Sequence, residues 1–193
     1  GHQFALADIV ADEKIASLFV QGYYASIYLA PHNYHRIHMP FAGELKQMIH
    51  VPGDLFAVNP TTMANMAVLA RNERVICVFD TSYGEMAVIM VGAMIVGSIK
   101  TLWAGRVQGR QLQCWTYPPD QVTLAAGDDI GEFRLGGSMV IVLFANRGFD
   151  WQKHLVAGQA IQMGQHMGGF DRLAAQDADQ TQQHKPSTAS QDS

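Results

Sequence analysis

The chain has 193 residues, a formal net charge of −4 at pH 7 and a sequence pI near 6.0. Apolar residues make up 48% and charged residues 16%, so a folded protein is expected, because disordered chains are rich in charge and poor in apolar side chains. The acidic balance argues against nucleic acid as a partner. Two cysteines, Cys77 and Cys114, are too few for a disulfide framework.

The ends of the chain and its longest apolar run predict the organisation. The chain begins at Gly1 rather than Met, and its first ten residues lack the basic start and apolar stretch of a secretory signal. The longest apolar run, Met86–Gly97, is 12 residues, whereas a spanning helix needs about 20, so we expect no membrane-spanning segment. Residues 171–193 are mostly small or polar, which predicts a disordered tail after a single domain over residues 1–170.

Short apolar segments follow one another along the chain, separated by glycine and proline turns. A helical pattern covers Thr62–Arg71, and Met86–Ile99 reads as a buried strand or strand pair with a bend at Gly92. The other predicted strands are Tyr23–Leu29, Leu45–Val51, Arg74–Phe79, Leu112–Thr116, Gln121–Leu124, Ile130–Leu135, Met139–Phe144 and the weaker Ile161–Met167. This spacing predicts a mainly β (α+β) fold, an antiparallel β-sandwich or barrel-like core with one or two short helices.

Three of the eight histidines, His32, His35 and His38, lie between Pro31 and Pro40. The prolines predict a loop or a single helical turn, on which His35 and His38 would face the same side. The histidines could be exposed loop residues, metal ligands or acid–base groups. The segment contains no cysteine or carboxylate and does not have the usual zinc spacing, so we predict no metal site. The segment alone does not decide between the other two interpretations.

A second unusual feature is the Gly136-Gly137-Ser138 sequence at the start of an apolar strand. The ordinary interpretation is a turn between two strands. A chemical interpretation is that the serine oxygen attacks the preceding carbonyl and forms an ester, whose elimination cuts the chain and leaves a pyruvoyl group. Such a ketone captures a substrate amine as a Schiff base and promotes loss of CO2, while a histidine returns a proton to the carbon.

Several segments together, in the right order, resemble the phosphatidylserine decarboxylase family over nearly all of residues 1–168. The histidine segment reads Tyr-Leu-Ala-Pro-His-Asn-Tyr-His-Arg-Ile-His-Met-Pro over Tyr28–Pro40, similar to the family's Tyr-His-Arg-x-His-x-Pro stretch. The other matching segments are Val51–Asn59, Ala70–Val75, Val91–Ile99, the cleavage segment Phe133–Phe144 and Met163–Gln165.

The resemblance implies a prokaryotic-type, pyruvoyl-dependent enzyme that converts phosphatidylserine to phosphatidylethanolamine and CO2. Ser138 matches the serine that becomes the pyruvoyl cofactor. Cleavage would give a β chain that ends at Gly137 and an α chain that begins at Ser138. His38 matches the histidine that acts as the base in self-cleavage, and His35 matches the histidine associated with decarboxylation and protonation of the substrate.

The resemblance also implies peripheral attachment to the cytoplasmic face of the bacterial inner membrane, and a homodimer. Two departures stand out. Met139 replaces the threonine of the common Leu-Gly-Ser-Thr motif, beside an extra glycine. The family's triad aspartate and its membrane-docking helices precede the region that matches Gly1, and Asp54 and Asp80 belong to other motifs. We therefore expect an N-terminally truncated chain whose self-cleavage lacks the aspartate that orients His38.

Two other functions remain open from the residues alone. A pyruvoyl decarboxylase of a soluble amino acid would use the same cofactor chemistry. A non-enzymatic β-rich binding domain would carry the histidines and Ser138 as loop residues.

Overall fold

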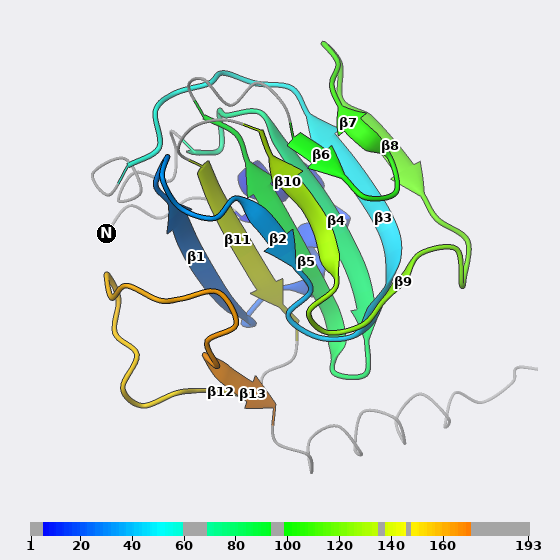
Figure 1. Ribbon diagram of the computed structural model, residues 1–193. Helices are drawn as coiled ribbons and strands as arrows, with labels where there is room; N and C mark the ends of the chain where they lie inside the picture. The colour runs from blue at the N-terminus through cyan, green and yellow to red at the C-terminus, as the bar shows by residue number, and fades with distance from the viewer. Residues whose placement is uncertain (1–5, 60–68, 94–98, 135–137, 146–147, 171–193) are drawn as a thin grey trace, which may run out of the picture. The chain divides into compact units, whose positions relative to one another are not determined.

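The computed structural model describes residues 6–59, 69–93, 99–134, 138–145 and 148–170. Strands dominate this part of the chain and pair antiparallel, which confirms the predicted fold class (Figure 1). Two compact units are present, Gly1–Arg147 and Gly148–Ser193. The division into one domain and a tail stays a prediction, and residues 171–193 lie outside the described residues.

The larger sheet of the first unit runs in the order β1-β11-β5-β4-β3-β8, and β9 also pairs with β3. Strands β3, β4 and β5 follow one another along the chain, whereas β11 returns late to lie between β1 and β5. The seven strands are β1 (Tyr23–Leu29), β3 (Gly43–Val51), β4 (Arg74–Thr81), β5 (Gly84–Val91), β8 (Gln113–Thr116), β9 (Thr123–Leu124) and β11 (Ser138–Phe144).

The smaller sheet of this unit packs on one face of the larger sheet, in the order β2-β10-β6-β7. The Trp103 indole, in the β6–β7 turn, donates to Met48 Sδ of β3 at 3.3 Å and packs edge-on against Phe79 of β4. The strands are β2 (Arg36–His38), β6 (Ile99–Thr101), β7 (Gly105–Val107) and β10 (Asp129–Phe133). The second unit contains β12 (Phe149–Trp151) and β13 (Gly168–Phe170).

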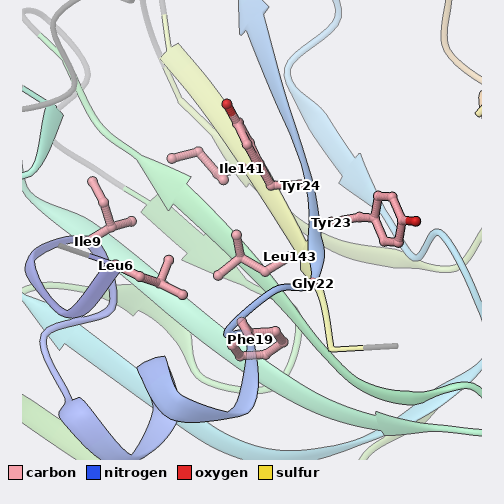
Figure 2. Close-up of a pocket in the computed structure, with 8 residues that line it drawn as sticks. All are labelled: Leu6, Ile9, Phe19, Gly22, Tyr23, Tyr24, Ile141 and Leu143. Carbon is pink, nitrogen blue, oxygen red and sulfur yellow. The ribbon is translucent and has the colours of Figure 1, made fainter. Parts of the chain in front are cut away.

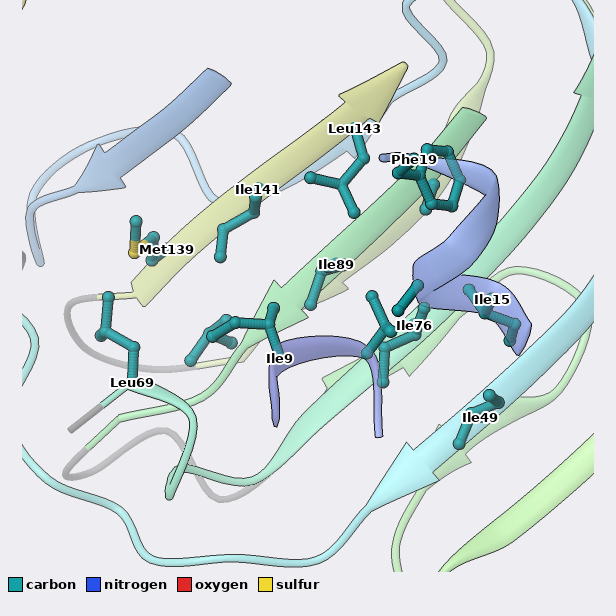
Figure 3. Packing of buried hydrophobic residues seen from close by; sticks show 14 of the residues in the cluster. Ile9, Ile15, Phe19, Ile49, Leu69, Ile76, Ile89, Met139, Ile141 and Leu143 are labelled. Atoms are coloured by element: carbon teal, nitrogen blue, oxygen red, sulfur yellow. The ribbon is translucent and has the colours of Figure 1, made fainter. Parts of the chain in front are cut away.

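Two short helices, α1 (Leu6–Val10) and α2 (Glu13–Leu18), cover the other face of the larger sheet. Figure 3 shows Ile9 of α1 against Ile89 and Ile141 of the sheet. Each fully buried side chain of this size contributes about 1.5–3 kcal/mol. Asp12 caps α2 by accepting hydrogen bonds from the amides of Lys14 (2.8 Å) and Ile15 (3.0 Å).

All seven residues of β11 are buried, and successive side chains enter different layers. Met139, Ile141 and Leu143 belong to the helix-side core. Ser138 and the residues that alternate with these three therefore face the smaller sheet. This alternation decides on which side of the molecule Ser138 can react.

Several local predictions need correction. The weak strand predicted at Ile161–Met167 is wrong, because β13 begins only at Gly168. Of the two interpretations of the run Met86–Ile99, the structure has two strands rather than one, since β5 ends at Val91 and β6 begins at Ile99. Most of the predicted helix Thr62–Arg71 lies outside the described residues. The two helices near the N-terminus were not predicted, because each is too short to show a helical period. None of the helices described is long and apolar enough to cross a membrane.

Arg74 is the polar anchor between α1 and the larger sheet. Its buried guanidinium donates to main-chain oxygens at four positions: Asp8 (2.7 Å), Ile9 (2.6 Å), Ala70 (2.6 Å) and Asn72 (2.9 Å). Burial lowers the pKa of Arg74 to about 10, so the group stays charged at neutral pH. A five-residue helix is not stable by itself, so these bonds hold α1 in place.

Replacing this anchor should destabilise the first unit. We expect Arg74→Met to lower the free energy of unfolding by about 2–4 kcal/mol, because it leaves several buried carbonyls without donors. Urea denaturation measures the change. Arg110→Met, at an exposed arginine, is the matched control and should change stability by less than about 0.5 kcal/mol. Equal effects of the two substitutions would contradict the anchoring role.

Candidate active site

Ser138 begins β11 and is fully buried. In the pairing register it is aligned with Leu29 of β1. Its side chain lies on the face of β11 that is turned toward the smaller sheet. Its Oγ lies 3.4 Å from Nδ1 of His35, which immediately precedes β2. The structure therefore brings together two of the residues that the sequence predicts for the site.

Hydrogen bonds fix both the main chain and the side chain of His35. The Phe133 amide donates to the His35 carbonyl at 3.0 Å, which continues the β2–β10 pairing by one residue. The Nε2 atom of the His35 ring lies 3.4 Å from the Pro31 carbonyl oxygen. A carbonyl only accepts, so the proton of the neutral ring belongs on Nε2, and Nδ1 accepts from the Ser138 hydroxyl. In this tautomer the Nδ1 atom of His35 can accept a proton from the Ser138 hydroxyl, and it can give a proton to a carbon atom of a molecule bound at position 138.

His38 lies elsewhere, on the opposite face of β2. The predicted loop or helical turn is wrong for Arg36–His38, because these residues form β2 and Ile37 is buried beneath the smaller sheet. Side chains alternate along a strand, so His35 and His38, three apart, point to opposite faces. The His38 ring bonds to the Tyr34 hydroxyl and the Gly127 carbonyl, each at 2.8 Å. Within the described residues no hydrogen bond joins His38 to Ser138.

A chain of ion pairs lies on that outer face and fixes β2 against β10. Arg36 pairs with Asp129 and, at 3.6 Å, with Glu132 of β10. Glu132 also accepts from Lys100 of β6 at 3.2 Å. Exposed pairs of this kind contribute little singly, but a linked set favours one register.

The other residues singled out in the sequence are placed as follows. His32 is exposed, and Gly137 lies outside the described residues. Asp54 pairs with Arg71 at 2.8 Å, and Asp80 approaches Lys46 at 3.9 Å, so neither aspartate supports His35 or His38. The described residues contain no group of three or more His, Cys, Asp or Glu that could hold a metal ion.

The motif around Asn72 forms part of the framework beside Ser138. The buried Asn72 amide donates to the carbonyls of Gly92 (2.8 Å) and Phe56 (2.9 Å) and accepts from the Phe56 amide. Gly92 follows directly after Val91, the residue of β5 that pairs with Met139 of β11. Asn72 thereby fixes the end of β5 that lies alongside Ser138. The next residue in the motif, Glu73, bonds to buried His50 at 2.8 Å.

An apolar pocket of about 170 Å³ opens elsewhere in the first unit, between the helices, β1 and β11 (Figure 2). The residues that line it are Leu6, Ile9, Phe19, Gly22, Tyr23, Tyr24, Ile141 and Leu143. Ile141 and Leu143 alternate with Ser138 along β11, so the pocket opens on the face of the sheet opposite to Ser138. It is not the space in which a molecule could contact Ser138 and His35.

Comparisons with known proteins show the family of the chain. Residues 1–169 match the sequence model of the family described as phosphatidylserine decarboxylase. The chain belongs to the phosphatidylserine decarboxylase family. It is 45% identical to a phosphatidylserine decarboxylase proenzyme of Hahella chejuensis over 172 residues, which are 87% of this chain and 58% of that protein. The proenzymes of Ectopseudomonas mendocina and Vibrio parahaemolyticus are 47% and 46% identical, over 87% and 85% of this chain and 61% and 60% of their own lengths. The chain thus spans about three fifths of these relatives.

Two contacts of His38 in this phosphatidylserine decarboxylase family member were not predicted from the sequence. Tyr34 lies four residues before His38 in the same motif, which was a usable signal. Gly127 lies 89 residues further along the chain, and no local pattern links it to a histidine.

Substitution of Gly131 tests whether the strands of the smaller sheet must pack closely beside the segment that carries His35. It lies in β10 between Ile37 and Thr101, and a Cβ there would overlap the main-chain oxygen of Lys100. We expect Gly131→Ala to lower the free energy of unfolding by roughly 2–4 kcal/mol, because backbone must move. Thermal or urea unfolding measures it. Gly109→Ala, where a Cβ would meet only the flexible Gln113 side chain, is the control, and an equal loss in both variants would contradict this role.

Proposed function

We propose that the protein is a phosphatidylserine decarboxylase proenzyme that releases CO2 from phosphatidylserine and yields phosphatidylethanolamine. The observation that carries the proposal is the buried Ser138 hydroxyl at 3.4 Å from His35 Nδ1, at the position that the resemblance assigns to the family's cleavage serine. The names of the relatives support the substrate and the proenzyme state.

The first proposed reaction is self-cleavage between Gly137 and Ser138. The Ser138 oxygen attacks the Gly137 carbonyl carbon, the peptide C–N bond breaks, and an ester and a free amine form. Loss of the proton on Cα then expels the Gly137 carboxylate, and hydrolysis of the remaining enamine releases ammonia and leaves a pyruvoyl group. A base must take the hydroxyl proton of Ser138 in the first step.

Two histidines are candidates for that base, on different grounds. The family resemblance assigns the role to His38, and we retain that assignment as a proposal. The contact with Ser138 is made by His35. His38 could act only after its ring leaves Tyr34 and turns around the edge of β2, so the two assignments differ in a way that substitution can separate.

The surroundings of Ser138 fit a pyruvoyl cofactor. Such a group supplies an electrophilic carbonyl that binds an amine and withdraws electrons from a neighbouring carboxylate. Position 138 is fully buried, which protects an electrophile from water. His35 Nδ1 faces this position, and we assign to His35 the transfer of a proton to the substrate carbon after CO2 leaves.

Phosphatidylserine is preferred over a soluble amino acid because the relatives carry its name. A substrate held in a bilayer requires contact with a membrane surface, and we propose peripheral attachment at the cytoplasmic face of the bacterial inner membrane. The products of cleavage, a β chain and an α chain, are expected to remain together, because β11 pairs with β1 along its whole length and with β5 from Met139 to Phe144. A homodimer is proposed from the family resemblance.

Self-cleavage can be measured directly by intact-mass spectrometry of the full-length protein. We expect two chains divided after Gly137 and a blocked α-chain N-terminus that reacts with borohydride. Ser138→Ala should abolish cleavage, because no oxygen remains to attack the carbonyl. Ser17→Ala, at an exposed serine of α2, should cleave normally. A full-length protein that stays uncut would reject the decarboxylase and favour a binding domain.

The division of roles between the histidines is tested by His35→Ala, His38→Ala and the exposed control His154→Ala. If the assignment is correct, His38→Ala blocks cleavage, whereas His35→Ala cleaves but loses CO2 release by at least about 100-fold, as expected for a lost proton-transfer group. Cleavage is followed on denaturing gels and CO2 with labelled substrate. If His35→Ala instead stops cleavage while His38→Ala does not, the contact seen here identifies the base and the assignment to His38 is wrong.

Substrate choice is measured with phosphatidylserine vesicles and with free serine, using the cleaved enzyme. We expect CO2 from the vesicles alone. Turnover of free serine without turnover of the vesicles would support the soluble-substrate alternative.

A further inference from the structure

The His38 side chain lies outside the Ser138–His35 pair but has two partners of its own. Its Nδ1 lies 2.8 Å from the Gly127 carbonyl oxygen, and its Nε2 lies 2.8 Å from the Tyr34 hydroxyl. The Tyr34 ring also stacks on the imidazole, with centroids 5.7 Å apart and planes at 12°. Three contacts therefore restrain one histidine that is only partly buried.

These partners determine which nitrogen holds the proton of the neutral ring. The Gly127 carbonyl has no hydrogen to give, so Nδ1 must be the N–H donor. Nε2 then carries the lone pair and accepts from the Tyr34 hydroxyl. This is the reverse of His35, whose proton belongs on Nε2. A histidine that is to act as a base through Nε2 must be in the Nδ1–H form.

The Gly127 carbonyl is itself fixed by its turn. The Gly127 amide donates to the Met39 carbonyl at 2.9 Å, and the Met39 amide donates to the Asp128 carbonyl at 2.8 Å. Asp128 also accepts from the Ala125 amide through its side chain. Gly127 has φ +88°, a conformation that suits glycine, and a Cβ at this position would meet no atom within 4 Å. The turn is therefore ordered around His38 and depends on glycine for backbone conformation, not for space.

We propose that Tyr34 and the Gly127 carbonyl are a positioning pair that fixes His38 as the Nδ1–H tautomer, with Nε2 as its basic nitrogen. The carbonyl sets the tautomer, and the hydroxyl holds the lone pair in the resting position on the outer face of β2, from which the ring turns toward Ser138. The functional part of this proposal rests on the role of His38 in self-cleavage proposed above, whereas the tautomer does not depend on that role.

The tautomer is read by ¹⁵N-histidine NMR of the full-length protein carrying Ser138→Ala, which stays uncut. A His38→Gln variant identifies the His38 signals. We expect the Nδ1–H pattern in the parent. Gly127→Ala keeps the carbonyl but strains the backbone that aims it at His38, so the ratio of Nδ1–H to Nε2–H forms should fall by about fivefold, the effect of disrupting one hydrogen bond. Tyr34→Phe, which keeps the stacked ring, should move the Nε2 resonance to that of a nitrogen that accepts no hydrogen bond.

Two control variants show whether the changes in the His38 signals come from backbone strain in general or from the loss of any tyrosine hydroxyl. Gly84 has φ +95° with equally open space, so Gly84→Ala imposes the same backbone strain away from the histidine. Tyr24→Phe removes the hydroxyl of another exposed tyrosine. Both should leave the His38 signals unchanged. An Nε2–H pattern in the parent, or changes equal to those of the controls, would overturn the proposal.

The rate of self-cleavage then tests the functional part, in protein that keeps Ser138. We expect Gly127→Ala to cleave about fivefold more slowly than Gly84→Ala, in proportion to the lost tautomer. If the tautomer shifts but both cleave equally, the positioning pair is not used in cleavage. If the parent itself does not cleave, the proposed function fails while the NMR result still decides the tautomer.

Discussion

The register of β11 between β1 and β5 is the constraint on which the candidate site depends. Ser138 is aligned with Leu29, and Met139 with Val91, in an unbroken antiparallel ladder. Because side chains alternate along a strand, a shift of the pairing register by one residue would turn Ser138 toward the helices and away from His35. Burial of all seven residues of β11 makes such a shift costly, since apolar side chains would lose their places on both faces. The same burial is expected to keep β11 in place after the chain is cut in front of it.

Strand alternation also explains why two histidines of one motif are separated. Ile37 between them is buried under the smaller sheet, which forces its neighbours to the other side of β2. His35 continues the inner series and reaches Ser138, whereas His38 shares the outer face with Arg36 and its ion pairs. The two rings consequently have different partners and opposite tautomers. Different chemical roles for the two histidines follow from this arrangement more readily than a shared one.

The sequence predicted the fold class and named Ser138 and His35, which the structure brings together, but it failed where long-range pairing decides the conformation. Continuous apolar runs such as Met139–Phe144 indicate a buried strand by composition alone. The segment Arg36–His38 has no such signal, and it becomes a strand because β10, some 90 residues later, offers a partner edge. Gly127 could not be linked to His38 for the same reason. The family motifs compensated in part, since they identified Ser138, His35 and His38 without any knowledge of which faces they occupy.

The partner of His38 has a chemical consequence. A carbonyl such as that of Gly127 orients the ring and selects its tautomer as well as a carboxylate does. It does not, however, carry the negative charge that stabilises the imidazolium formed when the ring takes a proton. The residue directly across from His38 in the pairing register is Asp129, and its carboxylate is engaged with Arg36. The described arrangement therefore selects the tautomer of His38 without compensating the charge that proton transfer to the ring would create. A base held in this way has its tautomer fixed, but its ring faces away from Ser138 and has no compensating charge. Self-cleavage through His38 therefore needs the ring to turn toward Ser138 and a negative group to approach Nδ1.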